Sequence, residues 1–155
     1  MASITAVVEA DSAASPSAVY EFLTDPSKMS QWINGISEAR WADGARLLPK
    51  NRILMKYEYR KRVSDIIMEI DAAEPGRRFA YHTVEGPYPI RVDFTLAPSG
   101  RGTRITFKQE ALSDSASSGF MFGLFGWALK PMVRKVLRKD LQKAAALAAG
   151  EPAPA

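Results

Sequence analysis

The sequence predicts an α+β fold in which a strongly curved antiparallel β-sheet wraps around one long C-terminal helix. Three observations predict it: one strand precedes two short helices, residues 36–110 then alternate between apolar and polar side chains, and a basic amphipathic pattern follows. The apolar face of a sheet needs a cover, and only the last helix is long enough to supply it. We therefore expect the short helices to fill one end, and either side chains or a cavity to occupy the remaining gap.

The first elements follow from local signals. Residues 3–10 mix β-branched residues with partial alternation, which is typical of a strand. The Ser-Pro pair at 15–16 places a capping hydroxyl before a proline at the first helical position, so a helix begins there. It should end near Thr24, because a second proline follows closely. A further short helix over residues 27–33 should stop at an Asn-Gly pair.

Period-two alternation dominates the middle of the chain. Glu-Pro-Gly, Gly-Pro and Ser-Gly signals separate several of the alternating segments, which indicates an antiparallel meander. One face of each clear strand carries aliphatic and aromatic side chains, and the other carries charges. The predicted strands cover residues 36–41, 52–59, 63–70, 78–84, 90–96 and 103–109.

A long amphipathic helix is predicted after the linker at residues 113–118 and reaches about Ala149. Pro131 should either kink this helix or divide it into two pieces. Residues 130–143 hold six basic side chains and one acid, Asp140, so this segment carries a charge of +5. The whole chain carries +4, so the remaining residues together carry −1 and the basic character belongs to this one segment. The expected apolar stripe consists of Leu129, Val133, Val136, Leu137, Leu141, Ala144 and Ala148.

Length and composition narrow the class of protein. A chain of 155 residues suits one domain, which we assign to residues 1–149, with a disordered tail at 150–155. The absence of cysteine excludes disulfides and thiolate chemistry. No signal-peptide pattern is present, and the longest charge-free apolar stretch, residues 119–129, is shorter than the ~20 residues that span a bilayer. We expect a cytoplasmic protein.

The alternation also argues against an active site. General acid–base catalysis needs a titratable group within reach of the substrate, yet the apolar strand faces carry none except tyrosine. His82, the only histidine, falls opposite Tyr81 on the charged face. We therefore predict no catalytic residue, no metal site and no cofactor. The hydroxyl groups left on the apolar face belong to Tyr57, Tyr59, Tyr81 and Thr83.

The basic helix allows three interpretations. A solvated outer face is the first, contact with an anionic membrane is the second, and nucleic-acid binding is the third. The basic face lacks interleaved aromatic residues for base stacking, so we predict no nucleic-acid partner. Membrane contact stays open as an alternative, because Trp127 and an apolar run adjoin the basic residues.

The order of elements resembles the START-like, or SRPBCC, superfamily, especially its polyketide cyclase/dehydrase and lipid-transport branch. The stretches that carry the resemblance are SPSAVYEFLTDPSKMSQW after the first strand, EPGRRFAY, and the hairpin APSGRGTRITF. The resemblance covers nearly the whole chain and implies a helix-grip fold with a hydrophobic cavity between sheet and long helix. Some members of the superfamily are enzymes and others only bind or carry ligands. No catalytic motif of the family is found in this chain.

These observations predict a protein that binds a hydrophobic or amphipathic small molecule, such as a lipid or an aromatic, polyketide-like compound. A cyclase or dehydratase-like enzyme and a peripheral membrane protein are the alternatives, and the oligomeric state is left open. The Phe- and Gly-rich residues 119–127 are interpreted as an adaptable gate at the cavity mouth. The predicted ligand contacts are Trp32, Met55, Tyr57, Tyr81, Phe94, Phe107, Met121, Phe125, Leu129 and Met132.

Overall fold

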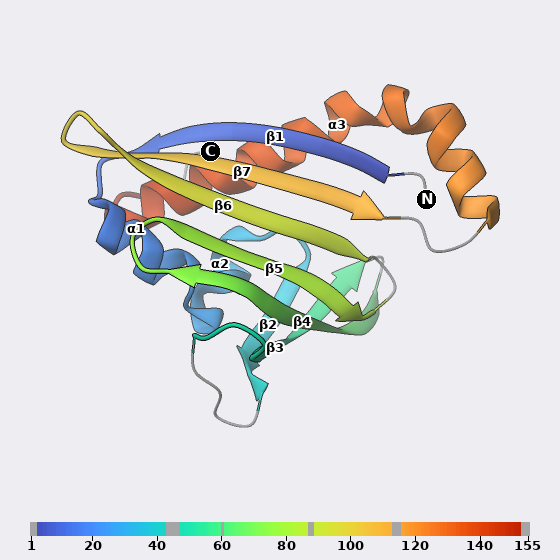
Figure 1. The fold of residues 1–155 in the computed structure, drawn as a ribbon, viewed down its shortest axis with the longest axis horizontal. Helices are drawn as coiled ribbons and strands as arrows, with labels where there is room; N and C mark the ends of the chain where they lie inside the picture. Colours follow the sequence, from blue (N-terminus) through green and yellow to red (C-terminus); the bar gives the residue numbers. More distant parts are fainter. Residues whose placement is uncertain (1–2, 43–46, 60, 87–88, 113–115, 153–155) are drawn as a thin grey trace.

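A seven-stranded antiparallel sheet and one long helix form the body of the computed structural model (Figure 1). The described backbone covers residues 3–42, 47–59, 61–86, 89–112 and 116–152, and the described side chains exclude residues 3, 4, 59 and 112–130. In chain order the elements are β1 (Ser3–Ser12), α1 (Pro16–Leu23), the 3₁₀ helix η1 (Pro26–Lys28), α2 (Met29–Trp32), β2 (Ile36–Trp41), β3 (Arg52–Tyr59), β4 (Arg62–Glu74), β5 (Arg78–Glu85), β6 (Ile90–Ser99), β7 (Gly102–Leu112) and α3 (Ala116–Ala148).

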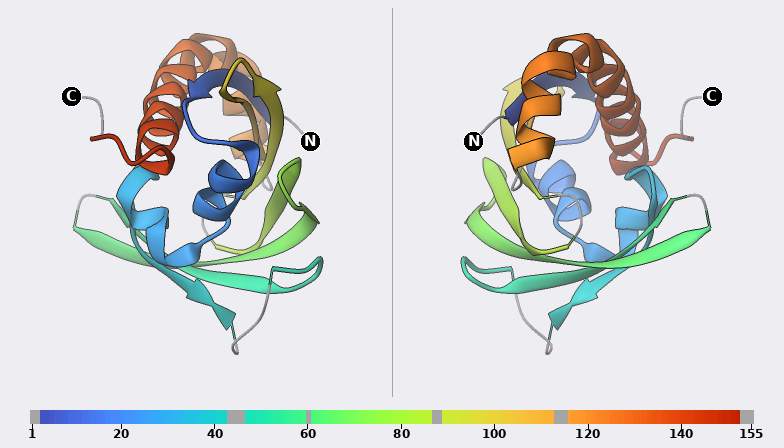
Figure 2. Two further views of the ribbon diagram at one scale, coloured as in Figure 1. Left: turned by 90° about the vertical axis from the view of Figure 1, so that its left-hand side faces the viewer. Right: turned by 90° about the vertical axis from the view of Figure 1, so that its right-hand side faces the viewer.

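The sheet order is β1-β7-β6-β5-β4-β3-β2, so the first strand returns to pair with the last one. The sheet curves, and its concave side encloses α1, α2 and α3 (Figure 2). Helix α3 packs mainly along β1, with further contacts to α1 and α2. The predicted α+β helix-grip fold, a curved antiparallel sheet around a C-terminal helix, is confirmed.

Local capping explains the short helices. Ser15 accepts a hydrogen bond from the backbone N–H of Ala18 at 3.2 Å, and the Thr24 hydroxyl donates to the carbonyl of Tyr20 at 2.7 Å. Helix α1 therefore begins and ends where the sequence predicts. The second predicted helix is divided into η1 and α2, because Asp25 caps a separate turn by accepting from the N–H of Ser27 at 3.0 Å.

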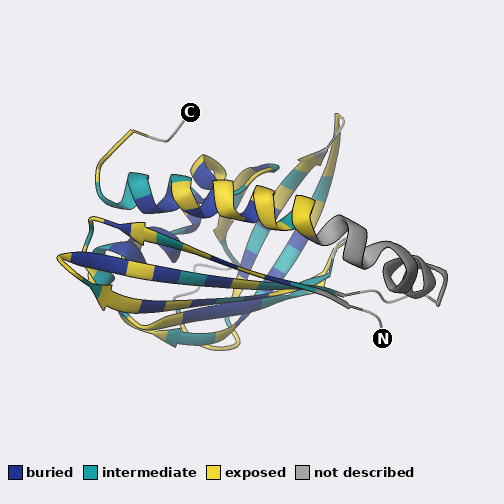
Figure 3. Cartoon of the chain, turned by 90° about the horizontal axis from the view of Figure 1, so that it is seen from above, coloured by how far each residue is buried: buried dark blue, intermediate teal, exposed yellow. Residues whose placement is uncertain are grey.

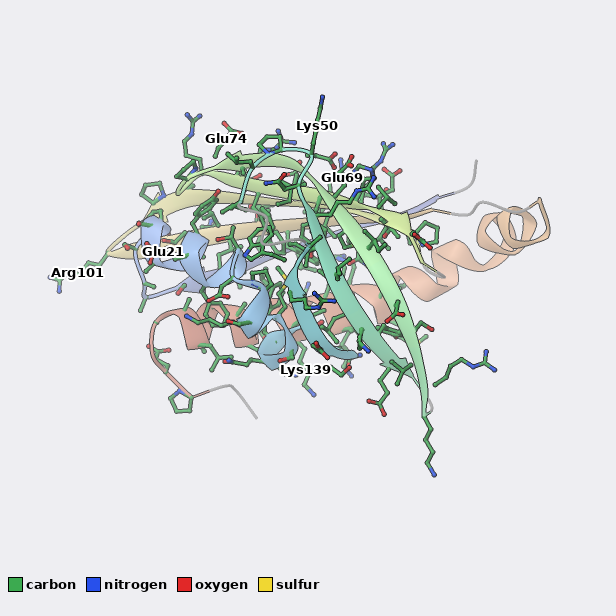
Figure 4. The ribbon with its side chains drawn as sticks, turned by 90° about the horizontal axis from the view of Figure 1, so that it is seen from below. Glu21, Lys50, Glu69, Glu74, Arg101 and Lys139 are labelled. Carbon is green, nitrogen blue, oxygen red and sulfur yellow. The ribbon has the colours of Figure 1, made fainter. Side chains whose placement is uncertain are left out.

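The strand faces follow the predicted alternation. On β6, Val92, Phe94 and Leu96 are buried, and β4 buries the matching residues on its own inner face. Charges occupy the outer face, where Arg78 binds Asp93 at 2.7 Å. Figure 4 shows Glu69 and Glu74 on this outer side of the sheet. This arrangement is expected for an antiparallel sheet with one solvent-exposed face and one face packed on the core.

Helix α3 presents one buried stripe and one exposed basic face (Figure 3). Leu137, Leu141, Ala144 and Ala145 are buried, and the Ser12 hydroxyl on β1 donates to the carbonyl of Ala145 at 2.7 Å. Pro131 lies inside a single helix and does not divide it into two pieces. Within the described residues, none of the helices combines the length and the apolar character that a membrane crossing requires. The predicted disorder at 150–155 partly concerns residues 153–155, which are outside the described part of the chain.

Candidate ligand-binding pocket

A cavity of about 240 Å³ lies between the inner face of the sheet, the connection from α2 to β2, and α3. Most of its wall is aliphatic or aromatic, as expected for a small-molecule site. The lining residues are Trp32, Ile33, Asn34, Ile36, Met55, Tyr57, Ile66, Met68, Tyr81, Thr83, Ile90, Phe107, Gln109, Val136, Leu137 and Asp140.

An aromatic cluster supports one wall of the pocket. Phe94 lies at its centre, with its ring 4.6 Å from that of Phe107 and 5.8 Å from that of Trp32, measured between centroids. Tyr81 and Phe79 complete the cluster at 6.4 and 6.2 Å from Phe94. Strand register produces this cluster, because Phe94 is the direct partner of Phe107 on one side and of Phe79 on the other.

Five of the predicted ligand contacts line the cavity, namely Trp32, Met55, Tyr57, Tyr81 and Phe107. Phe94 does not: it is fully buried behind the wall, where the surrounding rings separate it from the cavity.

Met132 does not line the cavity either. It is 59% exposed and lies one turn before Val136, the first of the described α3 side chains that line the pocket. The remaining predicted contacts, Met121, Phe125 and Leu129, and the predicted gate at 119–127 lie outside the residues whose side chains are described.

The expectation that titratable groups other than tyrosine stay off the apolar strand faces does not extend to α3, where Asp140 brings a carboxyl group to the cavity. It lines the pocket and is only 6% exposed, although it stands within the basic segment 130–143. Helical spacing could have revealed it, since Asp140 follows Leu137 by three positions and precedes Ala144 by four, both members of the apolar stripe. Asn34 and Gln109 are further polar lining residues that the sequence analysis missed.

The environment of Asp140 opposes its ionisation. Burial raises the pKa of the Asp140 carboxyl, and three weaker influences lower it again: the hydrogen bond from Asn34 and the positive charges of Lys143 and Lys139. The hydrogen bond runs from the backbone N–H of Asn34 to Oδ2 at 3.0 Å. It ties α3 to the connection between α2 and β2.

The other polar groups of the wall are neutral. Burial raises the pKa of the Tyr81 phenol, so this hydroxyl stays protonated at neutral pH. The Thr83 hydroxyl accepts a hydrogen bond from the N–H of Ile90 at 3.1 Å. The indole nitrogen of Trp32 is the one buried side-chain nitrogen or oxygen without a hydrogen-bond partner within the described part of the chain.

A close backbone approach places Tyr57 at the edge of the pocket. Gly35 has φ +89°, and a Cβ atom at this position would overlap the Tyr57 ring. Glycine is therefore required here both for its backbone conformation and for the space it leaves.

His82 lies on the outer face of the sheet, as the alternation predicts. Its Nδ1 is 2.8 Å from Oδ1 of Asp71, and its Nε2 is 4.0 Å from Oε2 of Glu69. It is thus held by carboxylates away from the pocket. Among the described residues, no three His, Asp or Glu side chains are placed to hold a metal ion.

Comparison with protein families gives a match along nearly the whole chain. A family model described as polyketide cyclase / dehydrase and lipid transport matches residues 1–149. A comparison with curated proteins finds no match.

Solved structures share the fold at low sequence identity. The di-domain ARO/CYC StfQ from the steffimycin biosynthetic pathway has a TM-score of 0.76 at 13% identity, covering 96% of this chain and 51% of that one. A protein from Chromobacterium violaceum has a TM-score of 0.65 at 19% identity over 94% and 98% of the two chains. A START superfamily protein from Mycobacterium smegmatis has a TM-score of 0.61 at 16% identity over 89% and 95%. These similarities establish the fold.

Proposed function

This chain belongs to the polyketide cyclase/dehydrase and lipid-transport family, and from that premise we propose that it binds a hydrophobic or amphipathic small molecule between its sheet and α3. The observation that carries the proposal is the cavity of about 240 Å³, whose wall is mostly aliphatic and aromatic. Burying the apolar surface of a ligand there contributes about 25 cal/mol per Å² before the entropic costs of association.

The size of the cavity narrows the class of ligand. Sites for drug-sized molecules usually enclose roughly 300–1,000 Å³, and this cavity is smaller. The wall includes the faces of Trp32, Tyr81 and Phe107, which suit flat rings. A compact aromatic or polyketide-like ligand therefore fits the described cavity better than a long-chain lipid.

Two exposed residues on α3 allow a matched test of the pocket. Val136 lines the cavity and is 40% exposed, while Met132, one turn earlier, is 59% exposed and does not line it. We expect Val136→Trp to fill the mouth and weaken binding of the uncharged fluorescent probe N-phenyl-1-naphthylamine about tenfold or more, because the new ring occupies ligand space. Met132→Trp should leave the affinity unchanged.

Probe fluorescence titrations of the full chain measure both variants, and native mass spectrometry of the freshly purified protein identifies a co-purified ligand. A wild-type protein that binds neither the probe nor any member of a broad hydrophobic library would contradict the proposal. Equal affinities of the wild type and Val136→Trp would place the binding site elsewhere.

A cyclase or dehydratase-like activity is the second candidate. Asp140 favours it, because this carboxyl is a titratable group on the pocket wall, close to a bound molecule. Tyr57 and Tyr81 add phenol groups to the same wall. In an enzyme, Asp140→Asn would abolish turnover of a ligand identified by mass spectrometry, whereas a carrier would return that ligand unchanged.

Contact of α3 with an anionic membrane is a further candidate. Met132 and Val136 expose apolar surface beside Arg134, Lys135 and Lys139, which are also exposed. Apolar and basic side chains on one exposed helix are the features of an interfacial helix. Sedimentation with phosphatidylserine vesicles at low salt tests this candidate, and protein that stays in the supernatant would refute it.

A further inference from the structure

We propose that Asp140 recognises a hydroxyl group of the ligand, so that the pocket selects hydrophobic molecules that carry one uncharged hydrogen-bond donor. This inference rests on the proposed function and adds the polar feature that the ligand must have. The observations that carry it are the burial of Asp140, its unused oxygen, and the charges around it.

Asp140 is the only charged side chain among the buried residues of the described part of the chain. The three other buried polar side chains, Ser12, Thr24 and Thr103, each donate to a backbone carbonyl at 2.7–2.8 Å. Their hydrogen bonds are satisfied by the protein itself. Asp140 differs because it lines the cavity and only its Oδ2 has a protein partner. Its Oδ1 is not among the fully buried side-chain atoms without a partner in the described part of the chain, so it is open to the cavity or to solvent.

Only one oxygen of this carboxyl group has a partner. Oδ2 accepts the N–H of Asn34 at 3.0 Å, and no other described residue donates a hydrogen bond to Asp140 or forms an ion pair with it. A carboxylate offers about four acceptor positions, and buried charges are normally paired or fully hydrogen-bonded. Oδ1 is therefore free to accept a hydrogen bond from a molecule in the cavity.

Tethering α3 is not a sufficient explanation for this acid. A hydrogen bond to the N–H of Asn34 needs one acceptor oxygen, which an asparagine at position 140 would also provide without the cost of burying an ionisable group. The second oxygen and its position on the pocket wall remain unexplained by the tether. A ligand donor accounts for both.

The surrounding charges favour a hydroxyl over an ammonium group. Lys139 is exposed on α3 (Figure 4), and it and Lys143 act on Asp140 as positive charges. Arg134, Lys135 and Arg138 extend the positive surface along the same helix. A cation approaching the mouth would be repelled by this field, whereas a neutral donor would not.

Three probes of nearly equal shape test the inference on the full chain: 2-naphthylmethanol, 2-ethylnaphthalene and protonated 2-naphthylmethylamine. We expect 2-naphthylmethanol to bind the wild type about tenfold more tightly than 2-ethylnaphthalene, because the alcohol can donate a hydrogen bond to Oδ1 and the hydrocarbon cannot. The ammonium probe should bind more weakly than the alcohol. Fluorescence titration or ligand-detected NMR gives the three affinities.

Asp140→Leu should reduce the alcohol-to-hydrocarbon ratio to about one without weakening the hydrocarbon, whereas a structural role alone would weaken both probes together. If the alcohol and the hydrocarbon bind the wild type equally, the inference is overturned and the proposed function stands. If the ammonium probe binds most tightly, the hydroxyl assignment is overturned. If no probe binds, the proposed function fails with it. If Asp140→Leu does not fold, the relative affinities of the wild type for the alcohol, the hydrocarbon and the ammonium probe still test the inference.

Discussion

Two successive turns of α3 meet the same sheet in different ways. The turn at 141–145 is packed solid: Leu141 and Ala144 are fully buried, and the carbonyl of Ala145 accepts a hydrogen bond from Ser12 on β1. The turn at 136–140 instead borders the cavity, with Val136 partly exposed and Asp140 on the wall. One helix thus serves as a fixed support and, one turn earlier, as a pocket wall.

The difference shows how the chain keeps a cavity open inside a tightly packed core. Small alanines let the helix approach β1 closely, which holds α3 in place. The pocket turn is then positioned by its neighbour and by the hydrogen bond between Asp140 and Asn34. On the sheet side, the aromatic cluster around Phe94 has the same supporting role for the wall formed by Trp32 and Phe107.

Among the substitutions that test this comparison, removal of the Phe94 ring should cause the largest loss of stability. Phe94→Ala is expected to lower the free energy of unfolding by about 3–5 kcal/mol, because it leaves a void between the four other rings of the aromatic cluster that supports the pocket wall. Leu137→Ala should cost less, about 2 kcal/mol, because a smaller side chain is removed and its site already borders a cavity. Urea unfolding measures both, and equal losses would contradict the distinction between the packed support, here the aromatic cluster, and the turn of α3 that borders the cavity.

Gly35→Ala should have an intermediate effect and act on the pocket edge. A methyl group at φ +89° is strained and overlaps the Tyr57 ring, so we expect a loss of about 1–3 kcal/mol and weaker probe binding. Gly100→Ala is the control: it has φ +58° with no atom within 4 Å of the new Cβ, so it should cost only the backbone strain of about 1–2 kcal/mol. Unchanged probe binding in Gly35→Ala would show that Tyr57 does not shape the site.

The smallest expected effect is the pH dependence that Asp140 confers. Its pKa is raised in the folded protein, so the native state holds this proton more tightly than the unfolded chain, and stability falls as pH rises above the ordinary carboxyl range. Asp140→Asn avoids this loss. Its free energy of unfolding should match that of the wild type near about pH 3 and exceed it near about pH 7, as measured by urea unfolding. A mutant that is less stable at neutral pH would show that ionised Asp140 stabilises the fold.

Much of the fold could be predicted because its signals are local or periodic. The capping hydroxyl of Ser15 marks the start of α1, and the alternation around Phe94 assigns the inner face of β6. The pocket wall was harder to predict. Phe94 and Phe107 share the same face and the same alternation, yet Phe107 lines the cavity and Phe94 is covered by the surrounding rings. Which of two equivalent inward residues is covered depends on strand neighbours and on Trp32, which are distant in the chain.

Periodicity in the chain was therefore enough to assign the antiparallel curved sheet, its dry face, its short capped helices and the closing amphipathic helix, since spacing along a strand or helix sets which side chains share a face. It was not enough to place the cavity, or to show that Asp140, whose spacing matches the apolar stripe of α3, lies on the cavity wall. Those depend on how far α3 stands from the sheet at each turn, and on the Asn34 N–H that meets Asp140 across 106 positions of sequence. Packing between distant segments decides such distances, and no local pattern encodes them.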